Sequence, residues 1–210
     1  MNYLNNDDLV TNFIRLHISQ EDAQEGFRIG GLPPKNIKPK VLINNTKFLL
    51  TMPINDKCEI SVFHSFDFDG SNNPFSLSRT IYDHTKNSVL QFVPHQPQKR
   101  AQSSDLLSEL TSHKIEISDT LYSEKEFDGE FCYPYHKIGG IPFFRFPLSE
   151  SLIDTCDELM DAGYFHLLQL AFPMGPEDGD IEGNWPFGEN VFHVFISNRD
   201  TDFKFKYIWG

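Results

Sequence analysis

Two copies of one short turn motif restrict what this chain can fold into. Each copy reads basic residue, Ile, Gly, Gly, aliphatic residue, Pro, first over residues 28–33 and again over residues 137–142. Consecutive glycines can adopt positive φ angles and allow another backbone to approach closely. The proline that follows has no N–H to donate to a neighbouring strand. Each motif therefore predicts a sharp corner at which a strand ends and the chain changes direction.

The sequence after each motif is also similar. A strand-like segment with two leucines and a proline at its end follows the first copy at residues 48–53 and the second at residues 166–173. A segment rich in Val and Phe comes next in both cases. We interpret the repeat as an internal duplication, with similar β-rich halves at residues 1–93 and 114–210 and a polar loop near residues 94–104. All 210 residues are expected to form a single domain.

The two glycine corners have two interpretations. In the first, successive backbone amides form a nest that faces an anion, and a neighbouring basic side chain assists. In the second, each corner only holds the sheet together. The second is favoured because neither copy lies in the order strand, glycine loop, Lys-Ser/Thr, helix that defines a phosphate-binding loop. The residues concerned are Arg28, Gly30, Gly31, Lys137, Gly139 and Gly140.

Period-two alternation predicts short strands along most of the chain. In the first of them, Ile14, Leu16 and Ile18 fall on one face, which is typical of a half-buried strand. Asn and Asp residues supply turns between strands, and Pro94 is expected to end the strand before it. The expected strands are residues 12–19, 41–43, 47–54, 59–66, 88–93, 114–117, 165–172, 190–197 and 203–209.

One later segment has a clear helical pattern. Ser149 can cap this helix and Gly163 can end it. Its apolar stripe consists of Leu152, Ile153, Cys156, Leu159 and Met160, and its opposite face carries Asp154, Asp157, Glu158 and Asp161. A second short helix is expected over residues 105–113. Together these patterns predict an α+β fold, mostly antiparallel β-sheet with a few short helices.

The net charge of the chain limits the classes of partner that it can bind. Acidic residues outnumber basic ones 30 to 18, and the formal net charge is -12. A phosphate backbone would be repelled, so nucleic-acid binding is not expected. The charge suits either ordinary solubility or the capture of a basic protein by electrostatic steering. Because neither a secretory signal pattern nor a stretch long enough to cross a bilayer is present, we expect a cytoplasmic protein that does not bind membranes.

Few side chains point to enzyme chemistry. His136, His166 and His193 could form a three-histidine site, but no HxH or HExxH spacing supports one. The three cysteines lack CxxC spacing and are interpreted as buried thiols. Serine-hydrolase and dinucleotide-binding glycine motifs are absent from the sequence. We therefore expect no enzyme activity, no catalytic residues, no cofactor and no metal.

Two loops concentrate carboxylates. Residues 67–72 superficially resemble a calcium loop, but they do not fit the EF-hand pattern. The second loop follows the predicted strand at residues 165–172. It is either a solvated loop or a docking surface for Lys and Arg side chains of a partner, with aromatic anchors nearby. Its acids are Glu177, Asp178, Asp180 and Glu182, and its aromatic residues are Trp185 and Phe187. The segment at residues 185–188 could equally be a turn that faces the core.

The second motif, the segment Leu167–Leu170 and the aromatic segment Phe192–Ser197 together resemble the YwqG-like family of bacterial proteins. The resemblance is best over residues 136–197, and in the first half it rests on residues 27–34 and the strand after them. It implies an α+β fold rich in antiparallel sheet and carries over no catalytic residues. Relatives of such domains occur beside bacterial toxin genes as immunity proteins.

Three functions are compatible with these patterns. The leading hypothesis is an immunity-type protein that binds a cognate toxin with a basic surface and neutralises it. The alternative is a small-ligand-binding or enzymatic domain with a pocket between the two halves, near the Gly-Gly-Pro turns and lined by His136, His166 and His193. A third is a housekeeping scaffold with no dedicated toxin. A deep histidine-lined pocket favours the second hypothesis, and a flat acidic face favours the first.

Overall fold

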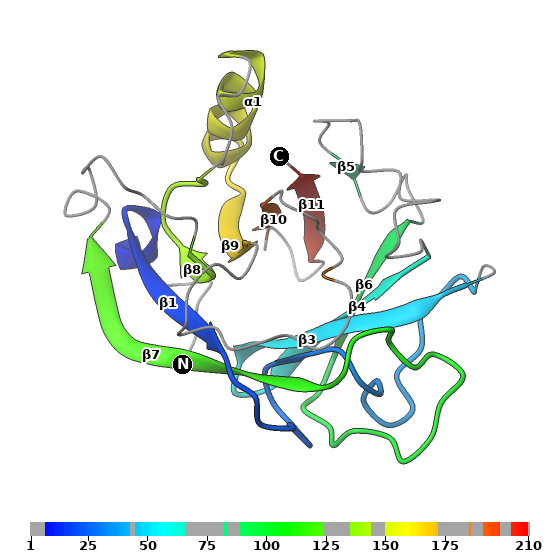
Figure 1. The fold of residues 1–210 in the computed structure, drawn as a ribbon. Coiled ribbons are helices and arrows are strands. Elements are labelled where there is room, and N and C mark those ends of the chain that lie inside the picture. The colour runs from blue at the N-terminus through cyan, green and yellow to red at the C-terminus, as the bar shows by residue number, and fades with distance from the viewer. Residues whose placement is uncertain are drawn as a thin grey trace.

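A computed structural model describes residues 7–42, 45–65, 82–83, 89–123, 135–143, 150–171, 185, 191–197 and 203–209. Its strands form one 11-stranded sheet (Figure 1), in which every described pair is antiparallel. The strands are β1 (Asn12–Ile18), β2 (Arg28–Ile29), β3 (Lys47–Asn55), β4 (Cys58–His64), β5 (Tyr82–Asp83), β6 (Leu90–His95), β7 (His113–Ser123), β8 (Lys137–Gly139), β9 (Phe165–Leu170), β10 (Phe192–Ser197) and β11 (Lys204–Trp209). A 3-10 turn, η2 (Asp7–Val10), precedes β1, and helix α1 (Glu150–Asp161) precedes β9.

The order of the strands is nearly symmetric about the centre of the sheet. It runs β5-β11-β10-β9-β8-β1-β7-β2-β3-β4-β6. We call β7, β2, β3, β4 and β6 the first half-sheet, and β1, β8, β9, β10 and β11 the second half-sheet. Strand β1 comes first in the chain yet pairs with β8, whereas β7 pairs with β2 from the first half of the chain. The first strand of each half of the sequence therefore belongs to the other half of the sheet.

The two half-sheets repeat the same backbone irregularities. Gly30 and Gly31 have φ angles of 77° and 71°, and Gly139 and Gly140 have φ angles of 79° and 70°. One extra residue, Leu49, bulges from the β3–β4 ladder. A corresponding extra residue, Leu167, bulges from the β9–β10 ladder. The bulged strands β3 and β9 pair with β2 and β8, the two strands that lead into the Gly-Gly corners. Each corner and the strand beside it therefore have matching local geometry.

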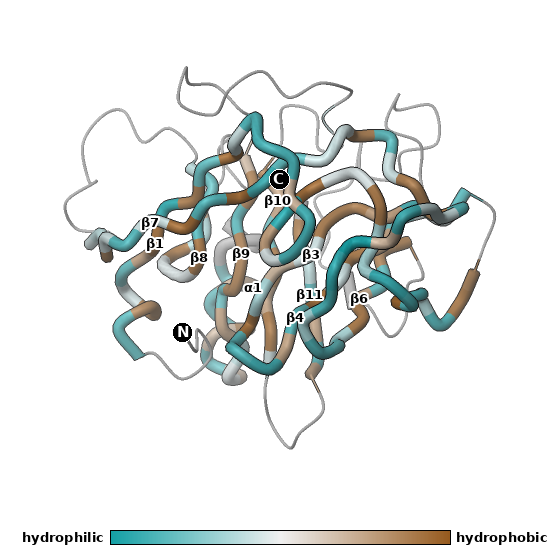
Figure 2. The backbone as a smooth tube through the Cα atoms, turned by 90° about the horizontal axis from the view of Figure 1, so that it is seen from below, coloured by the Kyte–Doolittle hydropathy of each residue, from teal (hydrophilic) through white to brown (hydrophobic). Residues whose placement is uncertain are grey.

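One hydrophobic core lies between the two half-sheets, because the sheet curls until their inner faces meet. Its buried residues come from both, among them Leu50 and Val62 of the first and Leu168 and Val194 of the second. Near the two ends of the curl, Phe92 of β6 stacks on Phe205 of β11 with ring centroids 4.7 Å apart and an interplanar angle of 9°. Figure 2 shows hydrophobic stretches along strands of both half-sheets. We call this cluster the shared core.

The outer faces of the two half-sheets have different covers. On the first, Phe48 and Phe63 pack against Leu106 and Ile37 from irregular segments. On the second, Phe195 and Ile208 pack against Cys156 and Leu159 of α1. The covering segments therefore bury a second, smaller apolar layer on each side of the sheet.

Helix α1 lies where the sequence pattern predicted a helix; in its predicted apolar stripe Met160 is half-buried, and the side chains of Leu152 and Ile153 are outside the described part of the structure. Cys156 and Leu159 face the sheet and are buried. At its end, the Gly163 N–H donates to the Met160 carbonyl and the Tyr164 N–H donates to the Leu159 carbonyl, both at 2.9 Å. With a φ of 82° at Gly163, this is a Schellman termination. The expected stop at Gly163 is thus confirmed, while the expected cap at Ser149 lies outside the described residues.

Three local predictions were wrong. Residues 105–113 form turns and the start of β7 instead of a helix, because the Leu106 carbonyl accepts from the Phe48 N–H and the Ser108 N–H donates to the Gly31 carbonyl. Val41 and Leu42 are not in a strand and are exposed. Pro94 lies within β6, which is tolerated because β6 is an edge strand.

The other expected strands are present with shifted ends, and the sheet is mostly antiparallel as predicted. Among the described residues, α1 and η2 are the helical elements, so the fold is more strongly β than the expected few short helices. No helix in the described part of the chain combines the length and the apolar character needed to cross a membrane.

The close approach at the first corner predicts a large effect for Gly30→Ala. A Cβ atom on Gly30 would lie 2.0 Å from the Thr111 carbonyl oxygen, whereas one on Gly26, which also has a positive φ, would meet nothing within 4 Å. Gly26→Ala should cost only the left-handed conformation, about 1–2 kcal/mol. Gly30→Ala should cost more than about 3 kcal/mol, since the backbone of Thr111 must also move. Urea unfolding of both variants tests this, and equal losses would contradict it.

Candidate functional site

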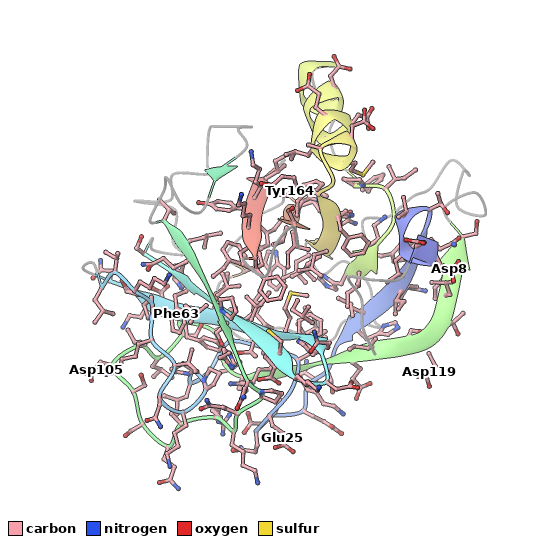
Figure 3. All side chains as sticks on the ribbon, turned by 180° about the vertical axis from the view of Figure 1, so that it is seen from behind. Asp8, Glu25, Phe63, Asp105, Asp119 and Tyr164 are labelled. Atoms are coloured by element: carbon pink, nitrogen blue, oxygen red, sulfur yellow. The ribbon has the colours of Figure 1, made fainter. Side chains whose placement is uncertain are left out.

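The acidic face of α1 is the predicted partner-binding surface that the structure describes most fully. Asp154, Asp157, Glu158 and Asp161 are all exposed. Figure 3 shows oxygen-tipped side chains on α1 that project away from the sheet. The last turn of the helix contains no basic residue. The structure therefore places these four carboxylates together on one solvent-facing surface.

The acidic loop after β9 lies mostly outside the described residues. This applies to Glu177, Asp178, Asp180, Glu182 and Phe187, and also to the loop at residues 67–72. Trp185 is described. It is half-buried, packs against the shared core, and has its ring 5.9 Å from that of His136. Part of the Trp185 side chain is thus used inside the fold.

The glycine corners use their amides for the sheet itself. The Gly30 N–H donates to the Leu49 carbonyl at 2.7 Å, and the Gly31 N–H donates to the Leu110 carbonyl at 2.9 Å. At the second corner, the Gly140 N–H donates to the Leu9 carbonyl at 2.8 Å. Because these amides already have backbone acceptors, they do not form an anion-binding nest. The geometry agrees with the interpretation of the motifs as structural corners.

The basic residue of each corner is buried beside it. Arg28 is 0% exposed, donates from Nη1 to the Gly26 carbonyl at 3.2 Å, and lies 5.6 Å from the centroid of the Phe48 ring. Burial lowers the pKa of Arg28 to about 10, although the nearby Glu59 carboxylate raises it in part. This side chain therefore fastens the first corner and does not reach solvent.

Lys137 has the corresponding role at the second corner. It is 3% exposed, its Nζ donates to the Ile141 carbonyl at 2.7 Å, and the same atom lies 4.9 Å from the centroid of the Phe13 ring. The ammonium is held against its own motif and an aromatic ring. Neither predicted basic residue is placed as a surface contact.

Only two of the three candidate histidines meet. His166 Nε2 lies 3.2 Å from His193 Nδ1, and His166 Nδ1 lies 3.0 Å from the Gly140 carbonyl oxygen. His136 instead accepts a hydrogen bond from the Ala171 N–H at 3.1 Å. Within the described residues, no group of three or more His, Cys, Asp or Glu side chains is placed to hold a metal ion.

The contacts assign the protons on the histidine pair. A carbonyl oxygen can only accept, so His166 carries its proton on Nδ1 and donates it to Gly140. In the neutral ring, Nε2 is then an acceptor, and His193 donates to it from Nδ1. The pair is thus a short chain of directed hydrogen bonds that ends at the second glycine corner.

Burial keeps all three histidines neutral near pH 7. Burial, together with the nearby Lys137 cation, lowers the pKa of His166 to about 3. The pKa of His193 is well below its usual value because of burial, His166 and Lys137, while a backbone contact with Phe143 raises it in part. Burial also lowers the pKa of His136 to about 3. None of the three is poised for proton transfer at neutral pH.

Sequence reasoning missed a polar network on the outer face of the first half-sheet. The Ser61 hydroxyl lies 2.8 Å from the Thr51 hydroxyl and 2.8 Å from His95 Nε2. His95 Nδ1 lies 2.7 Å from the Gln96 carbonyl oxygen, so Nδ1 carries the proton and Nε2 accepts from Ser61. Glu59 lies 3.9 Å from the same ring. The alternation of Glu59, Ser61 and Phe63 along β4 was the signal that could have placed these side chains on one face.

This network has the outline of an activated nucleophile but not its accessibility. A serine hydroxyl that donates to a histidine, with a carboxylate nearby, is the arrangement that enzymes use for acyl transfer. Ser61 is 0% exposed, however, and lies on a strand with neighbours on both sides. The arrangement therefore satisfies buried polar groups within the sheet and offers no substrate a path to the hydroxyl.

Both described cysteines are free thiols. Cys156 is buried on the face of α1 that meets the sheet, and Cys58 is half-buried in β4. Burial and the neighbouring Asp157 raise the pKa of Cys156 to about 12, and burial raises the pKa of Cys58. Both thiols are therefore weak nucleophiles at neutral pH.

Comparison with protein-family models, with curated proteins and with solved structures gives no match.

The neutral buried histidines predict a loss of stability in acid. A histidine whose folded-state pKa is lowered contributes its full stability above the unfolded pKa of about 6.5 and loses it as the pH falls toward the folded value. Each group should remove up to about 1.4 kcal/mol from the unfolding free energy for every pH unit below 6.5. His136→Asn retains an acceptor for the Ala171 N–H and removes this titration.

Urea unfolding of the wild type and of His136→Asn at pH 7.5, 6.5 and 5.5 checks this prediction. The variant should show the shallower dependence on pH between the last two values. Parallel curves for the two proteins would contradict it.

Proposed function

We propose that this chain is a binding protein of the immunity type, which captures a cognate toxin through the toxin's basic surface and blocks it. The observation that supports this most is the acidic face of α1. Its four exposed carboxylates, Asp154, Asp157, Glu158 and Asp161, lie opposite the face that docks on the sheet. A rigid helix that presents like charges to solvent is suited to steering and holding a basic partner.

The position of these charges within α1 supports a role in binding a partner. A helix C-terminus carries a partial negative charge, so Glu158 and Asp161 are unfavourable there, and no basic residue in the last turn offsets them. The packing of Cys156 and Leu159 and the termination at Gly163 hold the helix despite this. Residues that weaken local structure are expected at functional surfaces. Lysine or arginine side chains of a partner would relieve the repulsion.

The resemblance to the YwqG-like family adds support, since relatives of such domains occur as immunity proteins beside toxin genes. In this proposal the acidic loop extends the same surface, with Glu177, Asp178, Asp180 and Glu182 as further contacts and Trp185 and Phe187 as aromatic anchors. The protein acts in the cytoplasm, without enzyme activity, cofactor, nucleic acid or membrane.

The alternative of a ligand pocket between the halves has less support. The inner faces pack directly on one another, with Phe92 and Phe205 stacked at 4.7 Å. His136, His166 and His193 are each 2% exposed or less. We therefore do not carry that alternative forward.

We also propose that the two half-sheets descend from one duplicated unit. The matching glycine conformations, the matching bulges at Leu49 and Leu167, and the symmetric strand order support this. In this view β1 and β7 are equivalent strands that the two units have exchanged. The exchange would interlock the units, since each needs the other's first strand beside its Gly-Gly strand.

Charge reversal on α1 tests the binding proposal. The variant Asp154→Lys/Asp157→Lys/Asp161→Lys should lose at least about 100-fold in affinity for the toxin encoded beside this gene, because attraction becomes repulsion at three positions. Lysines near a helix C-terminus favour the helix, so circular dichroism should show α1 retained. Isothermal titration calorimetry at low and moderate salt measures the affinity.

A matched control is Glu25→Lys/Asp105→Lys/Asp119→Lys, which changes the net charge equally at three exposed positions. Figure 3 shows these residues at the end of the molecule away from α1. The control should retain most of the affinity. An α1 variant that binds like the wild type, or a control that loses as much, would exclude α1 as the docking surface.

A further inference from the structure

Polar side chains of the second half-sheet hold the segment that leads from the second glycine corner toward α1. Three of its backbone groups, at Gly140, Ile141 and Phe143, have side-chain partners. His166 donates to the Gly140 carbonyl, Lys137 donates to the Ile141 carbonyl, and Gln169 Oε1 accepts from the Phe143 N–H at 2.9 Å. We call Lys137, His166, Gln169 and His193 the clasp.

The clasp is continuous with the surface on which α1 rests. The His166 ring lies 5.2 Å from the Phe195 ring. Phe195 in turn packs with Cys156 and Leu159 of α1. His166 therefore holds the segment before the helix and also supports the side chain beneath it. A change in the state of this histidine can therefore reach α1 through the segment before the helix and through Phe195.

The surroundings of the clasp oppose an added proton. On β8, Lys137 lowers the pKa of both His166 and His193. On β1, Arg15 is the register partner of Lys137, and on β11, Lys206 is the register partner of Phe195. On α1, the Cys156 thiol packs inward, while Asp154, Asp157, Glu158 and Asp161 are exposed. A charged histidine here would lie close to the Lys137 cation.

We propose that the His166–His193 pair is a proton-sensitive latch for α1. In the closed state the neutral pair holds Gly140 and supports Phe195. Uptake of protons favours an open state in which the segment at residues 140–143 and α1 leave the sheet and the imidazoles reach water. This inference rests on the proposed function for its consequence, the loss of the acidic docking face in acid, but not for the opening itself.

The first half-sheet shows that the fold does not need histidines at these positions. The β-ladders place Phe48 opposite Phe63 where the second half-sheet has His166 opposite Phe195. They place Ser61 opposite Thr51 where it has His193 opposite Gln169. The substitutions His166→Phe and His193→Ser therefore use residues that the same backbone geometry already accepts.

The test measures how well α1 shields Cys156 in a protein with Cys58→Ser and Cys132→Ser. The rate of reaction with 4,4'-dithiodipyridine is divided by the rate for the unfolded chain at the same pH, which removes the titration of the thiol itself. Shielding should be high at pH 7.5 and fall about tenfold or more between pH 6.5 and 5.5, because opening gains about tenfold per pH unit for each proton taken up. Far-UV circular dichroism should show the sheet intact over this range.

In the His166→Phe/His193→Ser protein, shielding should stay constant between pH 6.5 and 5.5. If that protein does not fold, His193→Ser alone should reduce the pH dependence. Three results would each overturn the latch. Shielding of Cys156 could stay constant in the wild type, it could fall equally in the variant, or it could fall only together with unfolding of the sheet. Because the assay needs no toxin, its result is independent of whether the binding proposal holds.

Discussion

Each Gly-Gly corner lies against the backbone that leads into a strand from the other half of the chain. Gly30 and Gly31 contact residues 110–112, just before β7, and Gly139 contacts Leu9 and Asn12 at the start of β1. The contacts are so close that a side chain on Gly30 or Gly139 would collide with a carbonyl oxygen. These contacts hold β1 and β7 at the centre of the sheet. The other strands of each half-sheet lie to the outside of these two.

The two half-sheets share one backbone geometry, but different segments and side chains cover their outer faces. The first half-sheet is covered by irregular segments over Phe48 and Phe63, and its polar positions hold the hydroxyl chain of Thr51 and Ser61. The second carries a helix whose outer surface is acidic, with two histidines beneath it. Cys156 and Leu159 dock this helix on Phe195, and Phe195 also contacts His166, so the helix is coupled to a change at the clasp.

Much of the fold could be predicted from local pattern. Period-two alternation located the strands, since a pleated backbone turns alternate side chains to the same face. The stripe that includes Cys156 and Leu159 located α1, and positive φ was expected at the paired glycines. The helix expected near Leu106 and Leu110 was wrong because their spacing serves contacts with Phe48 and Gly30 across the sheet. Tertiary contacts between distant segments overrode local propensity there.

Some features of the candidate site could likewise be predicted from the sequence, and others could not. The sequence by itself determined the acidic face of α1, because the 3.6-residue period of a helix assigns Asp154, Asp157, Glu158 and Asp161 to one surface. It also determined the two corners, because paired glycines before a proline permit few other structures. Only the tertiary structure decided that β1 lies beside β8 and β7 beside β2, so that each belongs to the half-sheet of the other half of the chain. It also decided that His136 stays apart from His166 and His193, and that Arg28 and Lys137 are buried. Those outcomes depend on which strands become neighbours and which faces are covered, and the pairing of distant strands is not encoded in the spacing of residues along one segment.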